Sequence, residues 1–123
     1  MDEQTQITLN TIEHFNQIFN RHDVDAVIAA FTYDYVFENT SPSPDGERYE
    51  GQAAVRGFWQ AFFNSNLNAA FETEDLFAAN DRCTVRWVYR WVGANGVAGH
   101  VRGVDVFRVR DGKVAEKCSY VKG

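Results

Sequence analysis

Three turn signals divide the second half of the chain and constrain its fold most strongly. Asn-Asp at 80–81, Asn-Gly at 95–96 and Asp-Gly at 111–112 each separate two segments rich in β-branched and aromatic residues. Asn-Gly and Asp-Gly between such segments are the strongest short-range signals of a β-hairpin. Successive hairpins build a curved antiparallel sheet. The signals therefore predict four strands, near residues 69–79, 82–93, 97–110 and 113–122.

Helical spacing dominates the first half of the chain. Apolar residues recur at three- and four-residue steps, at Leu9, Ile12, Phe15, Ile18 and Phe19. Asp23 can cap a short second helix, and residues 51–65 carry the apolar stripe of a third. Between them, residues 33–39 alternate as a short strand and the Ser-, Pro- and Gly-containing stretch 40–51 is predicted to be a loop. The expected fold class is α+β, one domain over residues 1–123, with three N-terminal helices packed on the concave face of the sheet.

Charge and hydropathy exclude several kinds of partner. Of the 123 residues, 1–81 hold 14 acids and 3 bases, whereas 82–123 hold 3 acids and 9 bases. The bases form no clustered tract and the net charge is −5, so an acidic helical layer beside a basic sheet is favoured over a nucleic-acid partner. The N-terminal stretch lacks the features of a signal peptide, and no apolar run approaches ~18 residues. We expect a cytoplasmic protein without a membrane partner.

The cysteines and histidines do not predict a metal site. Cys83 and Cys118 lie in separate strand-like segments without metal-ligand spacing, and free thiols are the rule in a reducing cytoplasm. The three histidines, His14, His22 and His100, are scattered along the chain and form no ligand pair. We therefore expect neither a metal nor an organic cofactor.

One acid lies on an apolar face of its strand. With the two-residue period of a strand, Asp105 shares a face with Val101, Gly103, Phe107 and Val109. A carboxylate in such surroundings must find partners, stay protonated or perform chemistry. Asp105 could act as a general acid or base on a carbonyl-bearing substrate. It could equally be a structural residue, held by Tyr120 or by a backbone amide, and both interpretations remain open.

Aromatic residues are abundant enough to line a pocket as well as fill a core. The chain has ten Phe, five Tyr and three Trp, and "RWVYRW" places its three aromatic residues on one face of a strand. The alternative is that these rings are plain core. The residues expected to bind a small apolar molecule are Phe15, Tyr35, Phe37, Trp59, Trp87, Tyr89, Phe107 and Tyr120.

Two further assignments concern strand ends. Asn39 could orient a carbonyl or hydroxyl group of the ligand, as a second catalytic residue, or it could hydrogen-bond its own loop. In the last strand, the alternation predicts that Val114, Cys118 and Tyr120 face inward, and it also places Glu116 inside.

The order of elements, joined to the ending "RGVDVFRVRDGKVAEK", resembles the SnoaL-like branch of the nuclear-transport-factor-2-like superfamily. The resemblance spans nearly the whole chain, and its strongest piece is "DVFRVRDGK". It implies a cone-shaped α+β fold with a pocket between sheet and helices, usually dimeric through the outer sheet face. Members include polyketide cyclases, ketosteroid isomerase, limonene-epoxide hydrolase, dehydratases and proteins without a known reaction. The fold therefore does not select the reaction.

Compared with individual members, the chain matches only in part. Asp105 resembles the protonated Asp of ketosteroid isomerase, but Phe15 and Asn39 stand where that enzyme has its Tyr and its Asp base. The Arg-x-Asp of the epoxide hydrolase is missing from "VRWVYRW", and Ser119 falls where its second Asp would be. Polyketide cyclases of this fold use an Asp as general acid or base, and Asp105 is its counterpart. The resemblance favours an isomerase-, cyclase- or lyase-type enzyme, with a non-catalytic ligand-binding or dimeric interaction module as the alternative.

We predict a homodimer that forms through the outer sheet face. Val88, Val104 and Val106 are interleaved there with arginines, which makes the centre of this face too apolar to be left in water. Sedimentation velocity should show a dimer at roughly tens of micromolar, as for a stable interface. Monomer alone at that concentration would contradict the prediction.

Overall fold

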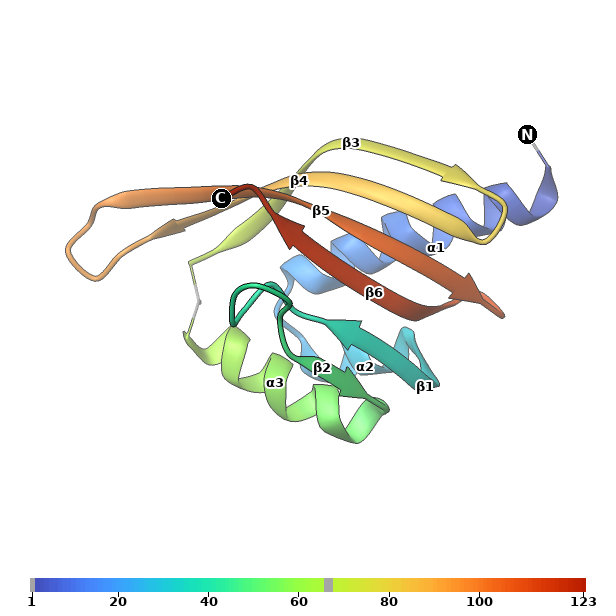
Figure 1. Cartoon of the computed structure of the whole chain (residues 1–123), viewed down its shortest axis with the longest axis horizontal. Helices are drawn as coiled ribbons and strands as arrows, with labels where there is room; N and C mark the ends of the chain where they lie inside the picture. The colour runs from blue at the N-terminus through green and yellow to red at the C-terminus, as the bar shows by residue number, and fades with distance from the viewer. Residues whose placement is uncertain (1, 66–67) are drawn as a thin grey trace.

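A computed structural model of the chain describes residues 2–65 and 68–123. Its elements, in chain order, are α1 (Glu3–Asn20), α2 (Val24–Ala29), β1 (Phe31–Glu38), β2 (Arg48–Glu50), α3 (Gln52–Ser65), β3 (Ala70–Ala79), β4 (Arg82–Val92), β5 (Ala98–Arg110) and β6 (Lys113–Val121) (Figure 1). None of the helices in the described part of the chain is long and apolar enough to span a membrane.

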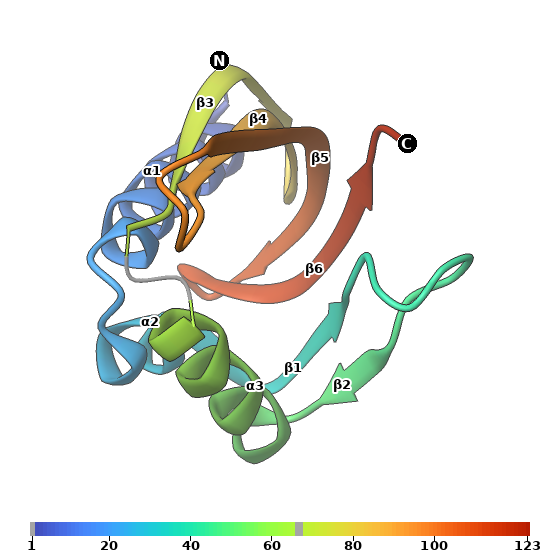
Figure 2. The same cartoon turned by 90° about the vertical axis from the view of Figure 1, so that its left-hand side faces the viewer.

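The strands form one curved, open sheet in the order β2-β1-β6-β5-β4-β3. Strands β3 to β6 are joined by successive antiparallel pairings, and β1 returns to pair with β6 in parallel. The sheet bends around α1, while α2 and α3 lie below it and close the concave side next to β1 (Figure 2). The predicted α+β architecture, with N-terminal helices on the concave face of a curved sheet, is confirmed.

The structure departs from the predicted elements at the edge of the sheet. Strand β1 begins at Phe31, two residues before the predicted start. Strand β2 falls inside the stretch that was predicted to be a loop, where Arg48 forms ion pairs with Glu38 at 3.0 Å and Glu50 at 2.9 Å. Three residues are too few to show a two-residue period, so the pattern could not reveal this strand.

Helix α1 is held on the sheet by its capped first turn and by polar contacts. The Asp2 side chain accepts a hydrogen bond from the Thr5 backbone N–H at 2.7 Å. The Thr8 hydroxyl donates to the Asn80 carbonyl at 2.6 Å, and the Asn80 N–H donates to Thr5 Oγ1 at 2.9 Å. These bonds join the helix to the turn between β3 and β4. They fix which side chains of α1 face the concave side.

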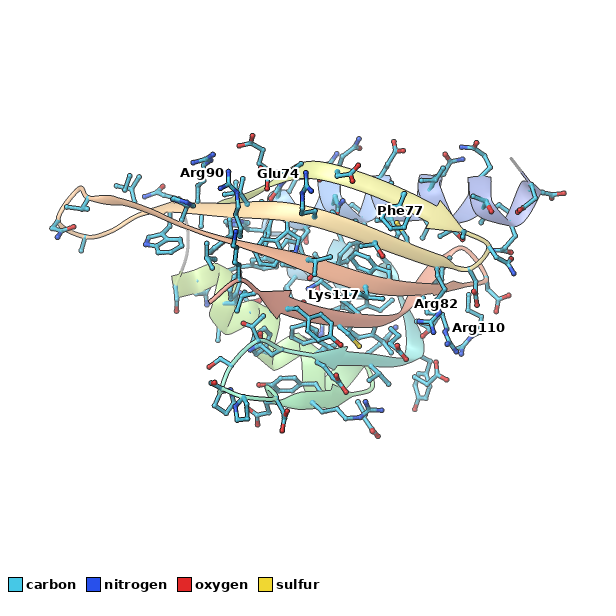
Figure 3. The ribbon with its side chains drawn as sticks, turned by 45° about the horizontal axis from the view of Figure 1, so that its top comes forward. Glu74, Phe77, Arg82, Arg90, Arg110 and Lys117 are labelled. Atoms are coloured by element: carbon cyan, nitrogen blue, oxygen red, sulfur yellow. The ribbon has the colours of Figure 1, made fainter. Side chains whose placement is uncertain are left out.

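The outer face of the sheet is covered by charged side chains around a valine. Val88 is only 1% exposed within the single chain, and its register partners on the neighbouring strands are Glu72 and Arg102. Glu72 forms an ion pair with Arg90 at 3.3 Å, and Arg102 forms one with Glu74 at 3.3 Å. Arg90 and Glu74 extend from β4 and β3 in Figure 3. The expectation that Val88 is exposed on this face is therefore wrong.

The homodimer remains a prediction and now depends on other residues of the outer face. Val104 and Val106 are half-buried. Tyr120, the register partner of Val104 on the adjacent strand β6, is 55% exposed. These side chains supply the apolar surface that a second copy would cover.

Two glycines of β5 make room for indole rings on the concave side. A Cβ atom at Gly103 would lie 2.5 Å from the Trp87 ring and 2.3 Å from the Tyr120 carbonyl oxygen. At Gly99, it would lie 2.7 Å from the Trp91 ring. Only glycine therefore lets these rings lie directly on the backbone of β5.

We predict that Gly103→Ala destabilises the protein by about 1–3 kcal/mol, because the added methyl group must displace Trp87 or the neighbouring strand. The matched control is Gly57→Ala, where a Cβ atom on exposed helix α3 meets nothing within 4 Å. This control should be neutral or stabilising by up to about 1 kcal/mol. Urea unfolding of both variants measures the difference, and equal stability of the two would contradict the account.

Candidate functional site

A buried pair of opposite charges joins β5 to β6 on the concave side. Asp105 is 6% exposed and Lys117 is 5% exposed, with 3.6 Å between Lys117 Nζ and Asp105 Oδ2. The Ser119 hydroxyl donates to Asp105 Oδ1 at 2.6 Å and accepts from Lys117 Nζ at 3.1 Å. The prediction that Asp105 faces the interior is confirmed. Its partners, however, are Lys117 and Ser119, and neither was predicted.

Lys117 faces inward because a β-bulge changes the phase of β6. Arg108 pairs with Glu116, but the next residue along β5, Val109, pairs with Val114. Ala115 is therefore an extra residue in the ladder. Such an insertion reverses the two-residue alternation beyond it. Glu116 consequently lies beside exposed Arg108 and not inside.

The bulge overturns the predicted inward set of the last strand. Val114 is fully buried as expected, but beyond it Lys117 and Ser119 face the interior in place of Cys118 and Tyr120. Tyr120 is 55% exposed and cannot line an interior pocket. Lys117 lies in the middle of β6 (Figure 3).

An aromatic cavity opens above the charged pair. It has a volume of about 240 Å³, and Asp105, Lys117 and Ser119 all line it. Its walls are predominantly rings, from Phe37, Phe58, Trp59, Phe62, Phe71, Trp87, Tyr89 and Trp91. A smaller pocket of about 20 Å³ continues beneath α1 and is also lined by Asp105 and Lys117. The charged pair therefore lines both spaces.

The predicted ligand-binding residues divide into three groups. The ones that line the aromatic cavity are Phe37, Trp59, Trp87 and Tyr89. Phe15 lines the smaller pocket instead. Phe107 and Tyr35 are fully buried and line neither space, because Phe107 packs on Phe15 and Tyr35 stacks on Phe31 with ring centroids 3.7 Å apart. Phe107, Tyr35 and Tyr120 therefore line neither of these two spaces, contrary to the expectation.

Asn39 lies at the rim of the cavity and also holds its own loop. Its side-chain oxygen accepts a hydrogen bond from the Thr40 backbone N–H at 2.8 Å. Its backbone N–H donates to the Glu47 carbonyl at 2.9 Å. The loop-holding interpretation is confirmed, while a catalytic role for Asn39 stays a prediction.

Several buried polar atoms near the cavity have no hydrogen-bond partner among the described residues. These atoms are Tyr35 Oη, Trp59 Nε1, Trp87 Nε1 and Tyr89 Oη. Burial raises the pKa of Tyr35 well above its ordinary value, and the charge of Asp105 raises it further. Tyr35 therefore keeps its proton at neutral pH. The other three residues line the cavity, although the polar atom of each is itself buried.

The ammonium group of Lys117 is surrounded by rings as well as by Asp105. Its Nζ lies 4.7 Å from the Phe37 ring centroid and 5.1 Å from that of Trp59. Burial lowers the pKa of Lys117, and the neighbouring Asp105 carboxylate partly opposes this effect.

Thiol and metal chemistry find less support in these residues. Cys83 and Cys118 are both free. Burial, with a smaller contribution from nearby carboxylates, raises the pKa of Cys83 to about 12 and that of Cys118 to about 11. Neither thiol is thus activated as a nucleophile. Within residues 2–65 and 68–123, no three His, Cys, Asp or Glu side chains cluster as metal ligands would.

We predict strong coupling between Asp105 and Lys117 in a double-mutant cycle. Lys117→Met alone should cost about 3–5 kcal/mol at pH 7, because it leaves a buried carboxylate without its counter-charge. Asp105→Asn should be destabilising for the converse reason. The double variant should be more stable than the sum of the single effects implies, by about 1–3 kcal/mol. Additive effects in urea unfolding would show that the two groups do not interact.

The chain was compared with known protein families and solved structures. The family model described as a SnoaL-like domain matches residues 12–117. A nuclear-transport-factor-2-like protein of unknown function from Mesorhizobium loti is 37% identical, covers 100% of this chain and 97% of its own, and superposes with a TM-score of 0.84. The comparison with curated proteins found no match.

Two further solved structures share the fold. A candidate polyketide cyclase from Xanthomonas campestris pv. campestris is 26% identical, with 98% of this chain and 93% of its own covered and a TM-score of 0.79. SalBIII, an epoxide hydrolase/cyclase-like enzyme of pyran ring formation in the polyether salinomycin, is 22% identical, with 95% and 92% covered and a TM-score of 0.80. With the family model matching most of its length, the chain belongs to the SnoaL-like domain family.

Proposed function

We propose that the protein is a small enzyme of the isomerase, cyclase or lyase type. It binds an apolar, carbonyl-bearing molecule in the aromatic cavity and uses Asp105 as general acid and base. The observation that carries this proposal is the position of Asp105, which is almost fully buried yet lines the cavity. The chemistry requires only side chains of this chain.

The contacts of Asp105 suit proton transfer next to a carbonyl group. One carboxylate oxygen accepts from Ser119, and the other faces Lys117 at 3.6 Å. In the proposed reaction, Asp105 removes a proton from the carbon beside the carbonyl group and returns it at another position. The positive charge of Lys117 stabilises the negative charge that develops on the substrate oxygen.

The aromatic walls favour an apolar substrate with one or two rings. Trp59, Trp87 and Tyr89 supply flat surfaces for stacking, and each also carries a polar atom without a partner in the described part of the chain. The likeness to the candidate polyketide cyclase, at 26% identity, supports a substrate of related chemistry, with ring and carbonyl groups.

A non-catalytic ligand-binding module is the second candidate. It is favoured by the internal contacts of Asp105 with Ser119 and Lys117, which would satisfy a purely structural carboxylate. The hydrogen bond between the Asn39 side chain and the Thr40 backbone N–H of its own loop also favours this candidate. The two candidates differ in one observable, which is proton transfer that depends on Asp105.

Binding is tested with 2-tetralone, a flat bicyclic ketone, by thermal unfolding and Trp fluorescence. A ligand at 100 times its dissociation constant adds about 2.7 kcal/mol, which for a domain of this size raises the melting temperature by about 8–15 °C. Trp87→Ala, which removes a wall, and Val101→Phe, which narrows the cavity, should abolish the shift. Tyr33→Ala is the matched control, because Tyr33 is 88% exposed.

The same ketone tests proton transfer. In D2O, the bound ketone should exchange the hydrogens beside its carbonyl group for deuterium, as followed by proton NMR. Asp105→Asn should slow this exchange by about 100-fold or more, whereas Asp75→Asn, an exposed carboxylate on β3, should not. Binding without exchange that depends on Asp105 supports the binding module. No shift with 2-tetralone, steroids, flavonoids, phenols or fatty acids would refute both candidates.

A further inference from the structure

Lys117 is the only buried lysine of the three in the chain. Lys113 and Lys122 are exposed, whereas Lys117 is 5% exposed and lines both the aromatic cavity and the smaller pocket. Its side chain therefore contacts the space in which the proposed function places the substrate. In the proposed acid–base reaction Lys117 acts only through its positive charge, and its nitrogen forms no bond to the substrate.

The Lys117 amine forms fewer hydrogen bonds than an ammonium ion can donate. An ammonium has three N–H donors, and among the described residues one hydrogen bond is formed, to Ser119 at 3.1 Å. Asp105 lies at 3.6 Å, beyond hydrogen-bond distance. Nζ lies 4.7 Å from the Phe37 ring centroid and 5.1 Å from that of Trp59, in a cation–π geometry that favours the charged form and partly offsets its burial.

Burial lowers the pKa of Lys117, so the neutral amine is more accessible than in water. The neutral form carries the lone pair that attacks a carbonyl carbon. Lysines that are desolvated in apolar pockets are activated in this way for imine formation.

We propose that Lys117 forms a covalent imine with an apolar ketone or aldehyde bound in the aromatic cavity. This inference rests on the proposed function, because the same cavity must first admit a carbonyl compound. It adds a nucleophile to the site and defines the substrate class by its free carbonyl group.

Imine formation needs no proton donor or acceptor other than Lys117, Asp105 and Ser119. The Lys117 ammonium first gives a proton to Asp105, directly or through the Ser119 hydroxyl, which contacts both groups. The amine lone pair then attacks the carbonyl carbon, and a proton passes from nitrogen to oxygen to form a neutral carbinolamine. Asp105 donates its proton to the carbinolamine hydroxyl, the C–O bond breaks and water leaves. The product is an iminium ion beside the restored Asp105 carboxylate, and no oxidant or reductant is needed.

An iminium ion would strengthen the chemistry of the site. It withdraws electrons from the neighbouring carbon more strongly than a carbonyl group does, so Asp105 removes a proton there more easily. The same electron sink allows a carbon–carbon bond one position further along to form or break.

The test uses 2-naphthaldehyde with sodium cyanoborohydride at pH 7. Cyanoborohydride delivers hydride to the iminium carbon and leaves a stable secondary amine, which peptide mass mapping locates. Lys117 should be labelled at least about tenfold faster than Lys113 and Lys122, because the cavity holds the aldehyde beside it. Lys117→Arg keeps a positive charge beside Asp105 but cannot form an imine, so this label should disappear. Lys113→Arg is the matched control and should keep it.

The outcomes separate this inference from the proposed function. If the aldehyde raises the melting temperature but Lys117 is unlabelled, or labelled no faster than Lys113 and Lys122, the imine is refuted and the acid–base function stands. If neither 2-naphthaldehyde nor any compound of the panel used to test the proposed function raises the melting temperature, both are refuted. If Lys117→Arg does not fold, peptide mass mapping of the labelled wild-type protein still tests the imine, because it compares the labelling rates of three lysines in one sample.

Discussion

Lys117 and Asp105, 3.6 Å apart inside the curve of the sheet, impose the strongest constraint on this structure. Two buried charges are stable only when each compensates the other and hydrogen bonds satisfy the rest. Ser119 supplies such a bond to each partner. Asp105 and Lys117 meet only in the observed register of β5 with β6. The surrounding rings must also leave the cavity open beside the two charges.

Backbone details of β5 and β6 make this arrangement possible. The bulge at Ala115 turns Lys117 inward, and Gly103 allows the Trp87 ring to lie directly on β5. In this position the Trp87 ring forms a wall of the cavity that Asp105 and Lys117 also line, and it does not fill that cavity. A cavity walled by rings with a charged floor can hold an apolar molecule and act on its polar group.

Much of the fold follows from patterns in the sequence, because hairpin dipeptides and apolar spacing are local signals. The inward positions of Asp105 and Trp87 follow from alternation within uninterrupted strands. The same rule fails for Tyr120, because one inserted residue at Ala115 reverses the phase, and nothing in "GKVAEKCSY" marks a bulge. Lys117 was missed for that reason.

Other errors arose where distant parts of the chain decide the outcome. Val88 was expected to be exposed, but ion pairs between neighbouring strands surround it. Tyr35 alternates like a pocket residue, yet it stacks on Phe31 inside the core. Single-strand patterns contain no information about which interior space the helices fill, so they could not separate cavity from core among the aromatic residues.

The pKa of Lys117, measured by NMR titration of its Cε or Nζ resonance, tests the central claim most directly. The account predicts a value below the ordinary 10.5, because the amine is buried. It also predicts a further fall in Asp105→Asn, since the carboxylate charge raises the pKa of Lys117, and a change in the resonance when 2-tetralone is added. A pKa of 10.5 or higher that does not respond to Asp105→Asn would contradict the account.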